Sequence, residues 1–293
     1  MTSWTAADLP SFAGRSVIVT GANSGLGAVT ARELARVGAD VTLAVRDVAK
    51  GRAAAAAMPG HNGEVAVRAL DLADLSSVRR FAEETPSVDV LINNAGIMAV
   101  PYAKTADGFE SQIGTNHLGH FALTNLLLPK LTDRVVTVSS FVHRMGRVNL
   151  KDLNWESRRY RPWLAYGQSK LANLLFTSEL QRRLVAAGST VRALAAHPGY
   201  SNTNLQGQTG NRIGDMLTRT IGNGLLATSP DFGARQTLYA ASQDLSGNTF
   251  VGPRFGLVGR TGSAGRSLLA KRGATAAGLW ELSERLTGVE FPL

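Results

Sequence analysis

The chain has 293 residues, of which 44% are hydrophobic and 18% charged, so it is long and apolar enough to bury a full globular core. It contains no cysteine, which excludes disulfides, thiolate nucleophiles and cysteine-ligated metals. The net charge of +9 comes from scattered basic residues, mildly concentrated between residues 254 and 272. A solvated basic surface explains this charge, and phosphate-rich partners are the alternative. Nucleic acid is not expected as a partner, and a salt-dependent gel shift would test for it.

The sequence has neither a membrane-spanning run nor a signal peptide. No stretch of eighteen consecutive apolar residues occurs, and the first residues lack the basic start and apolar run of a secretory signal. Repeats and low-complexity linkers are also absent. We therefore expect residues 1–293 to form a single domain in the cytoplasm, without a membrane span.

Short β-branched runs alternate with helical stretches along the chain. The expected strands cover residues 16–22, 40–47, 65–72, 88–96, 134–140, 190–199 and 248–253. The expected helices cover residues 28–38, 48–58, 76–84, 112–131 and 164–180. Nearly unbroken apolar strands that alternate with helices indicate a parallel sheet covered on both faces. The sequence thus predicts an α/β protein with a doubly wound parallel sheet, the Rossmann fold.

The stretch "VIVTGANSGLG" runs from the first strand directly into the first helix. Glycine lets the backbone turn tightly and approach a pyrophosphate, whose charge the free amides at a helix N-terminus can face. The alternative is a tight strand-to-helix connection without a ligand. Its position after the first strand favours a dinucleotide site. The expected coenzyme-binding residues of this turn are Gly21, Asn23, Ser24, Gly25, Leu26 and Gly27.

The end of the second strand bears on the choice of coenzyme. An enzyme that uses NAD usually places a carboxylate there, whereas this chain has Val45 followed by Arg46. A guanidinium suits a phosphate, which it can meet with charge and paired donors. The sequence therefore predicts a preference for NADP(H), with NAD(H) as the alternative. In the other interpretation Arg46 is an ordinary surface residue at a strand end.

The segment "LAYGQSK" places a phenol and an ammonium four residues apart in an otherwise apolar helix. Positions i and i+4 lie on the same helix face, so Tyr166 and Lys170 would present their polar ends to the same space. The pair could serve packing or proton transfer. An unperturbed tyrosine has a pKa of about 10. A lysine one turn away and the positive ring of an oxidised nicotinamide would both favour its phenolate.

Several motifs in order resemble the short-chain dehydrogenase/reductase family over roughly residues 15 to 255. They are "TGANSGLG", "NNAG", "TNHLGH", "TVSS", "YGQSK" and "HPG". The long 25-residue interval between Ser140 and Tyr166 resembles the branch that holds retinol dehydrogenases, the WW-domain oxidoreductase and protochlorophyllide reductases. The resemblance implies an NAD(P)-dependent enzyme that transfers hydride to or from an apolar alcohol, aldehyde or ketone.

The resemblance also assigns roles in catalysis. Tyr166 would protonate the carbonyl oxygen, Ser140 would hydrogen-bond that oxygen, and Lys170 would also hold the nicotinamide ribose. Asn116 would anchor a water that connects Lys170 to solvent. Taken singly, each residue has a structural alternative: Ser140 as a strand-end cap, Asn116 as a buried amide tying strands together, and Tyr166 as a core aromatic. Their joint occurrence, in order and after the glycine turn, favours catalysis.

Further coenzyme contacts follow from the same resemblance. Asp71 would contact the adenine amine, with an N-cap as the alternative role. The other implied contacts are Leu72, Asn93, Ala95, Gly96, Pro198, Gly199 and Thr203.

Two histidines and one glycine-rich segment raise separate questions. His117 and His120 are three apart and could share a helix face, but no glutamate or third histidine stands at ligand spacing, so no metal is expected. Residues 204–229 carry apolar side chains at near-helical spacing between glycines, which predicts either a substrate lid or a helix packed permanently on the core.

A function of another class stays open, namely a dinucleotide-binding regulator of the same fold that turns over no substrate. The complete set of Asn116, Ser140, Tyr166 and Lys170 favours the enzyme, because a regulator needs no such set. The sequence leaves open the substrate, the direction of the reaction and whether the protein forms a homo-oligomer.

Overall fold

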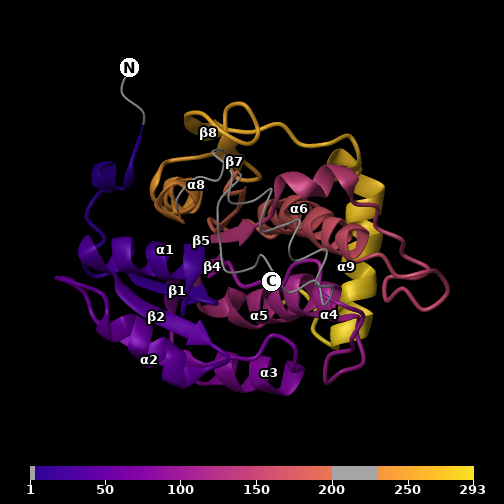
Figure 1. The fold of residues 1–293 in the computed structure, drawn as a ribbon, viewed down its shortest axis with the longest axis horizontal. Helices are drawn as coiled ribbons and strands as arrows, with labels where there is room; N and C mark the ends of the chain where they lie inside the picture. The colour runs from indigo at the N-terminus through magenta and orange to yellow at the C-terminus, as the bar shows by residue number, and fades with distance from the viewer. Residues whose placement is uncertain (1–3, 200–229) are drawn as a thin grey trace, which may run out of the picture.

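A computed structural model describes residues 4–199 and 230–293, which form one eight-stranded sheet with helices on both faces (Figure 1). The strand order is β3-β2-β1-β4-β5-β6-β7-β8, and every neighbouring pair is parallel except β7 and β8. The strands are β1 (Ser16–Thr20), β2 (Asp40–Val45), β3 (Val65–Ala69), β4 (Val88–Asn93), β5 (Leu131–Val138), β6 (Arg192–Ala196), β7 (Phe250–Pro253) and β8 (Thr261–Ser263). The predicted doubly wound fold is confirmed.

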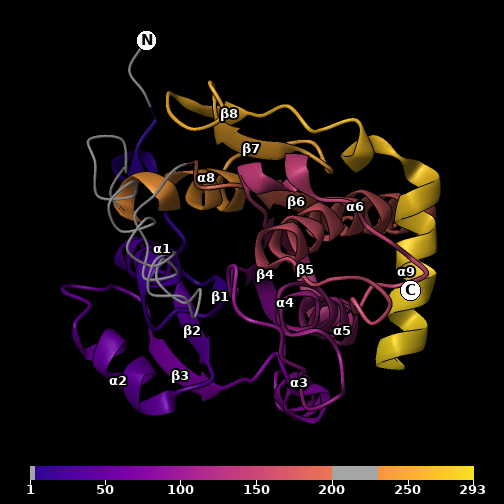
Figure 2. The ribbon, with the colours of Figure 1, turned by 45° about the vertical axis from the view of Figure 1, so that its right-hand side comes forward.

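The helices divide between the two faces of the sheet (Figure 2). One face carries α1 (Gly25–Arg36), α2 (Val48–Ala56) and α8 (Pro230–Ser242). The other carries α3 (Leu75–Glu83), α5 (Gly119–Leu127) and α6 (Pro162–Ala186), with α9 (Gly273–Thr287) packed outside α6. The short helices are η1 (Ala6–Asp8), α4 (Ser111–Ile113), η2 (Gly114–Leu118), η3 (Leu128–Lys130), η4 (Phe141–Met145) and η5 (Leu269–Lys271).

Strand side chains alternate between two separate cores. Val17 and Val19 of β1 pack with the α1 and α8 side, whereas Ile18 between them packs with α3, α5 and α6. Val135 and Val136 of β5 divide in the same way. This alternation follows from the period of two in a strand, and it explains why the sequence shows unbroken apolar runs. The carboxyl ends of the parallel strands therefore meet at one edge, where ligands of such sheets bind.

The predicted helix over residues 112–131 is present as one uninterrupted helical run over residues 111–130. Its hydrogen bonding changes along the run, which passes from α4 through the π-helical turn η2 and the helix α5 to the single turn η3. Pro129 in η3 cannot donate a backbone hydrogen bond, and Leu131 already belongs to β5. The predicted strand over 134–140 is displaced along the sequence. The observed strand β5 begins at Leu131 and ends at Val138.

Among the described residues, no helix combines the length and the apolar character needed to cross a membrane. The segment 204–229, for which a lid was one expectation, lies outside the described residues.

Candidate active site

The glycine turn after β1 lies directly against the loop after β4. Gly21 has a φ of +66°, and a Cβ on it would lie 2.9 Å from the Cα of Ala95. A Cβ on Gly27 would come within 2.5 Å of both the Asn94 amide nitrogen and the Gly21 carbonyl oxygen. Only glycine fits these two positions, because the turn packs directly against the loop after β4 and against its own backbone. The turn also contains Asn23 and Ser24, and Ser24 is the N-cap of α1. Gly25 and Leu26 are the first two residues of that helix.

Thr20, the last residue of β1, holds the two loops together. Its hydroxyl accepts hydrogen bonds from the backbone amides of Asn94 (3.0 Å) and Ala95 (2.9 Å). The Asn94 side chain donates in return to the Thr20 carbonyl at 2.8 Å. Sequence analysis did not single out Thr20, although a fully buried polar residue at the end of an apolar strand is a signal that could have found it.

Asn93 is the last residue of β4 and directly precedes the loop after this strand. Its amide is buried and donates to the Thr124 hydroxyl of α5 at 2.9 Å. The Asn93 side chain is therefore turned toward α5, whereas Gly96 of the same motif lies near the proton-transfer candidates. A Cβ on Gly96 would meet Asn116 Oδ1 at 3.1 Å and Lys170 Nζ at 3.4 Å.

Tyr166 and Lys170 lie one turn apart on α6, as the sequence predicts, and both are buried. Burial raises the pKa of Tyr166 to about 12, and a hydrogen bond with the Ser140 side chain acts in the opposite direction. The phenol is therefore protonated at neutral pH in the protein alone. Ser140 follows β5 and caps η4 by accepting from the Val142 amide at 3.2 Å, so it also has the capping role considered as an alternative.

Lys170 is a buried ammonium without a carboxylate partner among the described residues. Its Nζ donates to the Val138 carbonyl at 3.1 Å and lies 5.6 Å from the centre of the Tyr166 ring. Burial lowers the pKa of Lys170 to about 8. The site therefore holds a poorly compensated positive charge close to a phenol, and this arrangement favours any nearby negative charge.

Asn116 lies in the π-helical turn η2 and links this turn to two other segments. Its Oδ1 accepts from the Ile97 amide at 2.8 Å, and its Nδ2 donates to the Ile97 carbonyl and to the Ser169 hydroxyl, both at 2.9 Å. Ser169 in turn donates to the Tyr166 carbonyl at 2.8 Å. The buried Asn116 amide thus ties the loop after β4 to the turn of α6 that carries the tyrosine and the lysine. Single π turns inside helices are frequent at functional sites.

The residues expected near the adenine end lie around the ends of β2 and β3. Arg46 follows β2 and is exposed, and no hydrogen bond or ion pair holds its guanidinium within the described part of the chain. Asp71 accepts from the Ala73 amide at 2.9 Å. The alternative role of Asp71 as an N-cap is wrong, because Asp74 caps α3 through the Ser76 and Ser77 amides. Leu72 is buried, and its carbonyl lies 2.3 Å from where a Cβ on Gly119 would stand.

The two histidines of "NHLGH" face different partners. His117 Nε2 lies 3.0 Å from the Ser283 hydroxyl of α9, and His120 Nε2 lies 2.9 Å from the Thr20 hydroxyl. Within the described ranges, no group of three histidine or acidic side chains is placed to hold a metal ion. The burial of these rings lowers the pKa of His117 to about 3 and that of His120 to about 4, so both are neutral.

The turn after β6 is packed against the loop between β7 and β8. Gly199 has a φ of +71°, and a Cβ on it would lie 2.5 Å from the Leu257 carbonyl oxygen and 2.7 Å from the ring of Pro253. Pro198, which precedes it, is half-buried in the same turn. Thr203, the remaining predicted coenzyme contact, lies outside the described residues.

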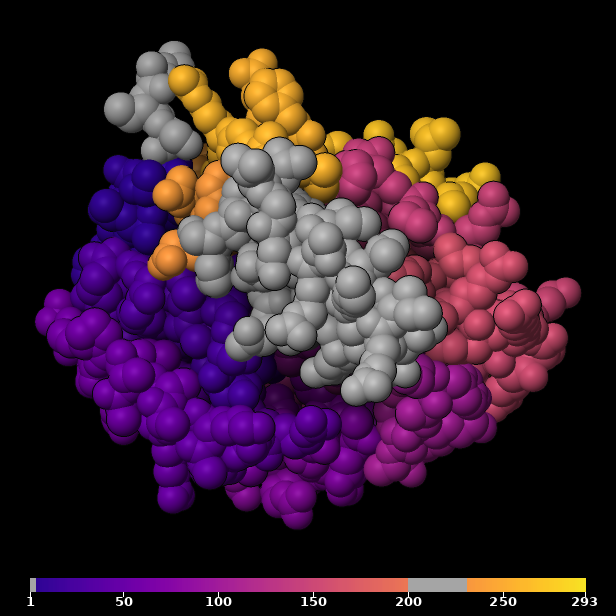
Figure 3. All heavy atoms as spheres, viewed as in Figure 1, coloured from indigo at the N-terminus to yellow at the C-terminus, as the bar shows by residue number. Residues whose placement is uncertain are grey.

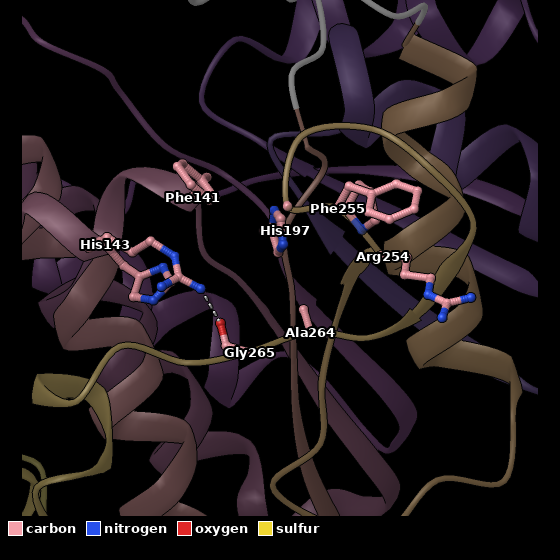
Figure 4. A pocket seen from close by; sticks show the side chains of 10 residues that line it. Phe141, His143, His197, Arg254, Phe255, Ala264 and Gly265 are labelled. Carbon is pink, nitrogen blue, oxygen red and sulfur yellow. Dashed lines mark hydrogen bonds between the residues drawn. The ribbon is translucent and has the colours of Figure 1, made fainter.

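A pocket of about 330 Å³ opens beside this turn (Figure 4). Phe141, which directly follows Ser140, lines it together with His143, Arg144, His197, Arg254 and Phe255. Arg144, another lining residue, donates to the Gly265 carbonyl at 2.9 Å. The part of the chain that forms β7, β8 and their loop stands at the top of the molecule in Figure 3. The pocket combines aromatic and cationic side chains, and Ser140 itself is not among the residues that line it.

Comparisons with known proteins agree with this geometry. The model of the short chain dehydrogenase family matches residues 15–213. Human retinol dehydrogenase 13 is 45% identical over 295 residues, covering 95% of this chain and 86% of its own. A crystal structure of an uncharacterized protein from Mycobacterium paratuberculosis is 70% identical and covers both chains completely, with a TM-score of 0.88.

A more distant structure contains a coenzyme. It is a protein from Beutenbergia cavernae named as an NAD(P)-dependent gluconate 5-dehydrogenase, solved with NADP bound at low occupancy. It is 27% identical, with a TM-score of 0.62, and the match covers 83% of this chain and 96% of that one. The chain described here therefore belongs to the short-chain dehydrogenase/reductase family and is an NAD(P)-dependent oxidoreductase of CH–OH and C=O groups.

Proposed function

We propose that the protein transfers hydride between NADP(H) and an apolar alcohol, aldehyde or ketone, with Tyr166 as the proton donor and acceptor. The observation that carries this proposal is the group formed by the buried Tyr166 and Lys170 and the half-buried Ser140 at the carboxyl edge of the sheet. A buried phenol and a buried ammonium without a carboxylate partner among the described residues are costly for folding and useful for proton transfer.

The residues present fit a nicotinamide dinucleotide. Glycine at positions 21 and 27 lets the turn after β1 pack tightly before α1, whose first backbone amides have no intrahelical acceptor and can face a pyrophosphate. The exposed Arg46 follows β2, near the strand end at which this fold binds the adenosine ribose, and its guanidinium, unbonded within the described part of the chain, suits a 2′-phosphate. We therefore infer a preference for NADP(H) over NAD(H). When bound, the coenzyme supplies or takes the hydride.

Each side chain around Tyr166 has a separate role in proton transfer. In reduction the protonated phenol donates its proton to the carbonyl oxygen, and the Ser140 hydroxyl holds that oxygen in place. The Lys170 ammonium stabilises the phenolate that results, because unlike charges attract strongly in a buried site. Asn116 ties its own turn to the loop after β4 through Ile97 and to α6 through Ser169.

The apolar substrate class rests on the relatives, which at 41–45% identity are retinol dehydrogenases. They favour an apolar alcohol or aldehyde, without selecting one compound. The pocket lined by Phe141 and Phe255 also carries two arginines and two histidines, so it does not by itself select an apolar ligand.

The direct test is a coenzyme-oxidation screen of a panel of aldehydes and ketones with NADPH and, separately, with NADH. We expect turnover of apolar carbonyl compounds, with a higher kcat/KM for NADPH. Tight coenzyme binding without turnover of any compound in either direction would contradict the proposed reaction and support the regulator instead.

A further inference from the structure

His120 sits at the centre of a hydrogen-bond chain that joins the coenzyme turn to the proton-transfer group. Its Nδ1 lies 3.1 Å from the Asn116 carbonyl oxygen, and its Nε2 lies 2.9 Å from the Thr20 hydroxyl. The ring is 1% exposed. His120 is therefore bonded at both nitrogens by residues from η2 and from the end of β1.

The chemistry of the partners determines the tautomer. A carbonyl oxygen only accepts, so Nδ1 must carry the hydrogen and donate to Asn116. Nε2 of the neutral ring is then an acceptor, and the Thr20 hydroxyl must donate to it. The same hydroxyl lies farther, at 3.4 Å, from the Ile92 carbonyl. The Thr20 oxygen then has its lone pairs free to accept from the Asn94 and Ala95 amides.

Every donor in this chain has an acceptor only while the ring is neutral. Burial, together with the charge of Lys170, lowers the pKa of His120 to about 4, although the bond to the Asn116 carbonyl opposes the shift. The ring is thus neutral throughout the physiological range. A proton on Nε2 would point at the Thr20 hydroxyl and force it to reorient toward another acceptor.

The two ends of the chain meet the parts of the site that must be aligned. At one end, the Thr20 hydroxyl holds the Asn94 and Ala95 amides beside Gly21, the first glycine of the coenzyme turn. At the other end, the Asn116 backbone carries the side chain that contacts Ile97 and Ser169. We propose that His120 is a positioning residue for hydride and proton transfer, which holds the coenzyme turn and the Asn116 turn at a fixed separation. This inference rests on the proposed function.

The test uses two shape-conserving substitutions and their combination. His120→Phe keeps most of the ring volume but removes both hydrogen bonds, and Thr20→Val keeps the shape of the threonine but removes its hydroxyl. In each variant we expect coenzyme affinity and kcat to fall about tenfold or more, because even a small displacement of the reacting groups lowers the rate strongly. The double variant should be little worse than the more severe single variant, since both remove the same chain.

A third variant separates the two ends. Asn125 of the same helix donates through Nδ2 to the Phe121 carbonyl, four residues before it, at 3.0 Å. His120→Asn should reach the Asn116 carbonyl in the same way but should not reach Thr20. We expect this variant to recover kcat more than it recovers coenzyme affinity.

The matched control is Ser283→Ala in α9, which removes the partner of the buried ring of His117, three residues before His120. It should lower the melting temperature slightly and leave kcat and coenzyme affinity unchanged. Additive losses in the Thr20→Val and His120→Phe cycle, or a lower melting temperature with unchanged kinetics in both, would overturn the inference. If the wild-type protein turns over no carbonyl compound, the proposed function fails, and coenzyme affinity in the same variants still tests the role of His120.

Discussion

The most unusual single residue in this site is Lys170, a buried cation with a backbone carbonyl as its acceptor. Burial lowers its pKa from 10.5 to about 8, so the folded protein binds this proton less tightly than the unfolded chain does. The native state therefore carries a penalty at all pH values below about 8, and stability should rise as the pH increases from about 8 to about 10.5. The charge is kept at a cost to the fold, as functional groups often are.

Lys170→Met should remove this penalty while abolishing the charge that supports the phenolate. The Val138 carbonyl keeps a second donor in Asn173, at 3.1 Å, so the substitution leaves no unbonded acceptor. At pH 7 we expect the free energy of unfolding to be unchanged or higher, by at most on the order of 3 kcal/mol. Turnover and coenzyme binding should both fall. Chemical denaturation at pH 7 and pH 10 checks the sign, and a clear loss of stability at pH 7 would contradict this account of the lysine.

Arg46 makes the coenzyme preference testable at one side chain. A hydrogen bond to a charged group contributes about 1.5 to 3 kcal/mol, so Arg46→Asp should weaken NADPH binding at least about tenfold. NADH binding should change less. Calorimetric titration of both coenzymes measures this difference. The control is Arg52→Asp, which makes the same charge change at an exposed position of α2. Equal affinity of the wild-type protein for NADH and NADPH would refute the assignment.

At the level of elements, the sequence could predict the strands and most helices because their periodicity is local. The π turn could not be predicted, because "GTNHLGH" reads as an ordinary helix until its contacts with Ile97, Ser169 and Thr20 are known. β8 was missed because its three residues, Thr261–Ser263, have no apolar pattern and pair only through the backbone. The positions of Tyr166 and Lys170 on one helix face, and of the glycine turn before α1, could be predicted because each depends on short-range spacing.

The close packing of the turn after β1 against the loop after β4 can be tested at Gly27. Gly27→Ala would press a methyl group to within 2.5 Å of the Asn94 side chain and the Gly21 carbonyl. We expect the free energy of unfolding to fall by about 1 to 3 kcal/mol, as for other overpacked sites, and coenzyme affinity to fall with it. Gly273→Ala, at the start of α9, has no atom within 4 Å of the new methyl group and should be neutral or slightly stabilising. Thermal unfolding with and without NADPH compares the two.

At the level of the whole molecule, α9 extends the core outside the sheet. Trp280 is 1% exposed, stacks on Phe176 of α6 at 5.7 Å, and meets Phe121 of α5 edge-on at 4.9 Å. The two helices that α9 covers carry, or directly follow, the residues of the proton-transfer group. The C-terminal helix thus packs behind the site, and through Ser283 and His117 it also contacts the turn that carries Asn116. Sequence analysis assigned no element to this region, although the buried residues Ala276, Leu279, Trp280 and Ser283 recur at helical spacing and could have indicated a helix.

Trp280→Ala should therefore reduce stability more than activity. Removal of a buried tryptophan costs about 3 to 5 kcal/mol, which chemical denaturation would measure. At a temperature where the variant stays folded, kcat should remain within about threefold of wild type, a barrier change below 1 kcal/mol. Leu268→Ala, at a position 83% exposed, should change neither quantity. A large loss of kcat in folded Trp280→Ala would mean that α9 takes part in the site directly.

The most direct test of the proposed reaction is the steady-state turnover of Tyr166→Phe, measured beside its affinity for NADPH. Phenylalanine keeps the packing of the buried ring and removes only the hydroxyl that the proposal uses as acid and base. We expect kcat to fall by about 10² to 10⁴, the range for general acid–base catalysis, while the Kd for NADPH stays within a few-fold of wild type. Reduction of any substrate by this variant at the wild-type rate would contradict the mechanism and leave Tyr166 as a core aromatic.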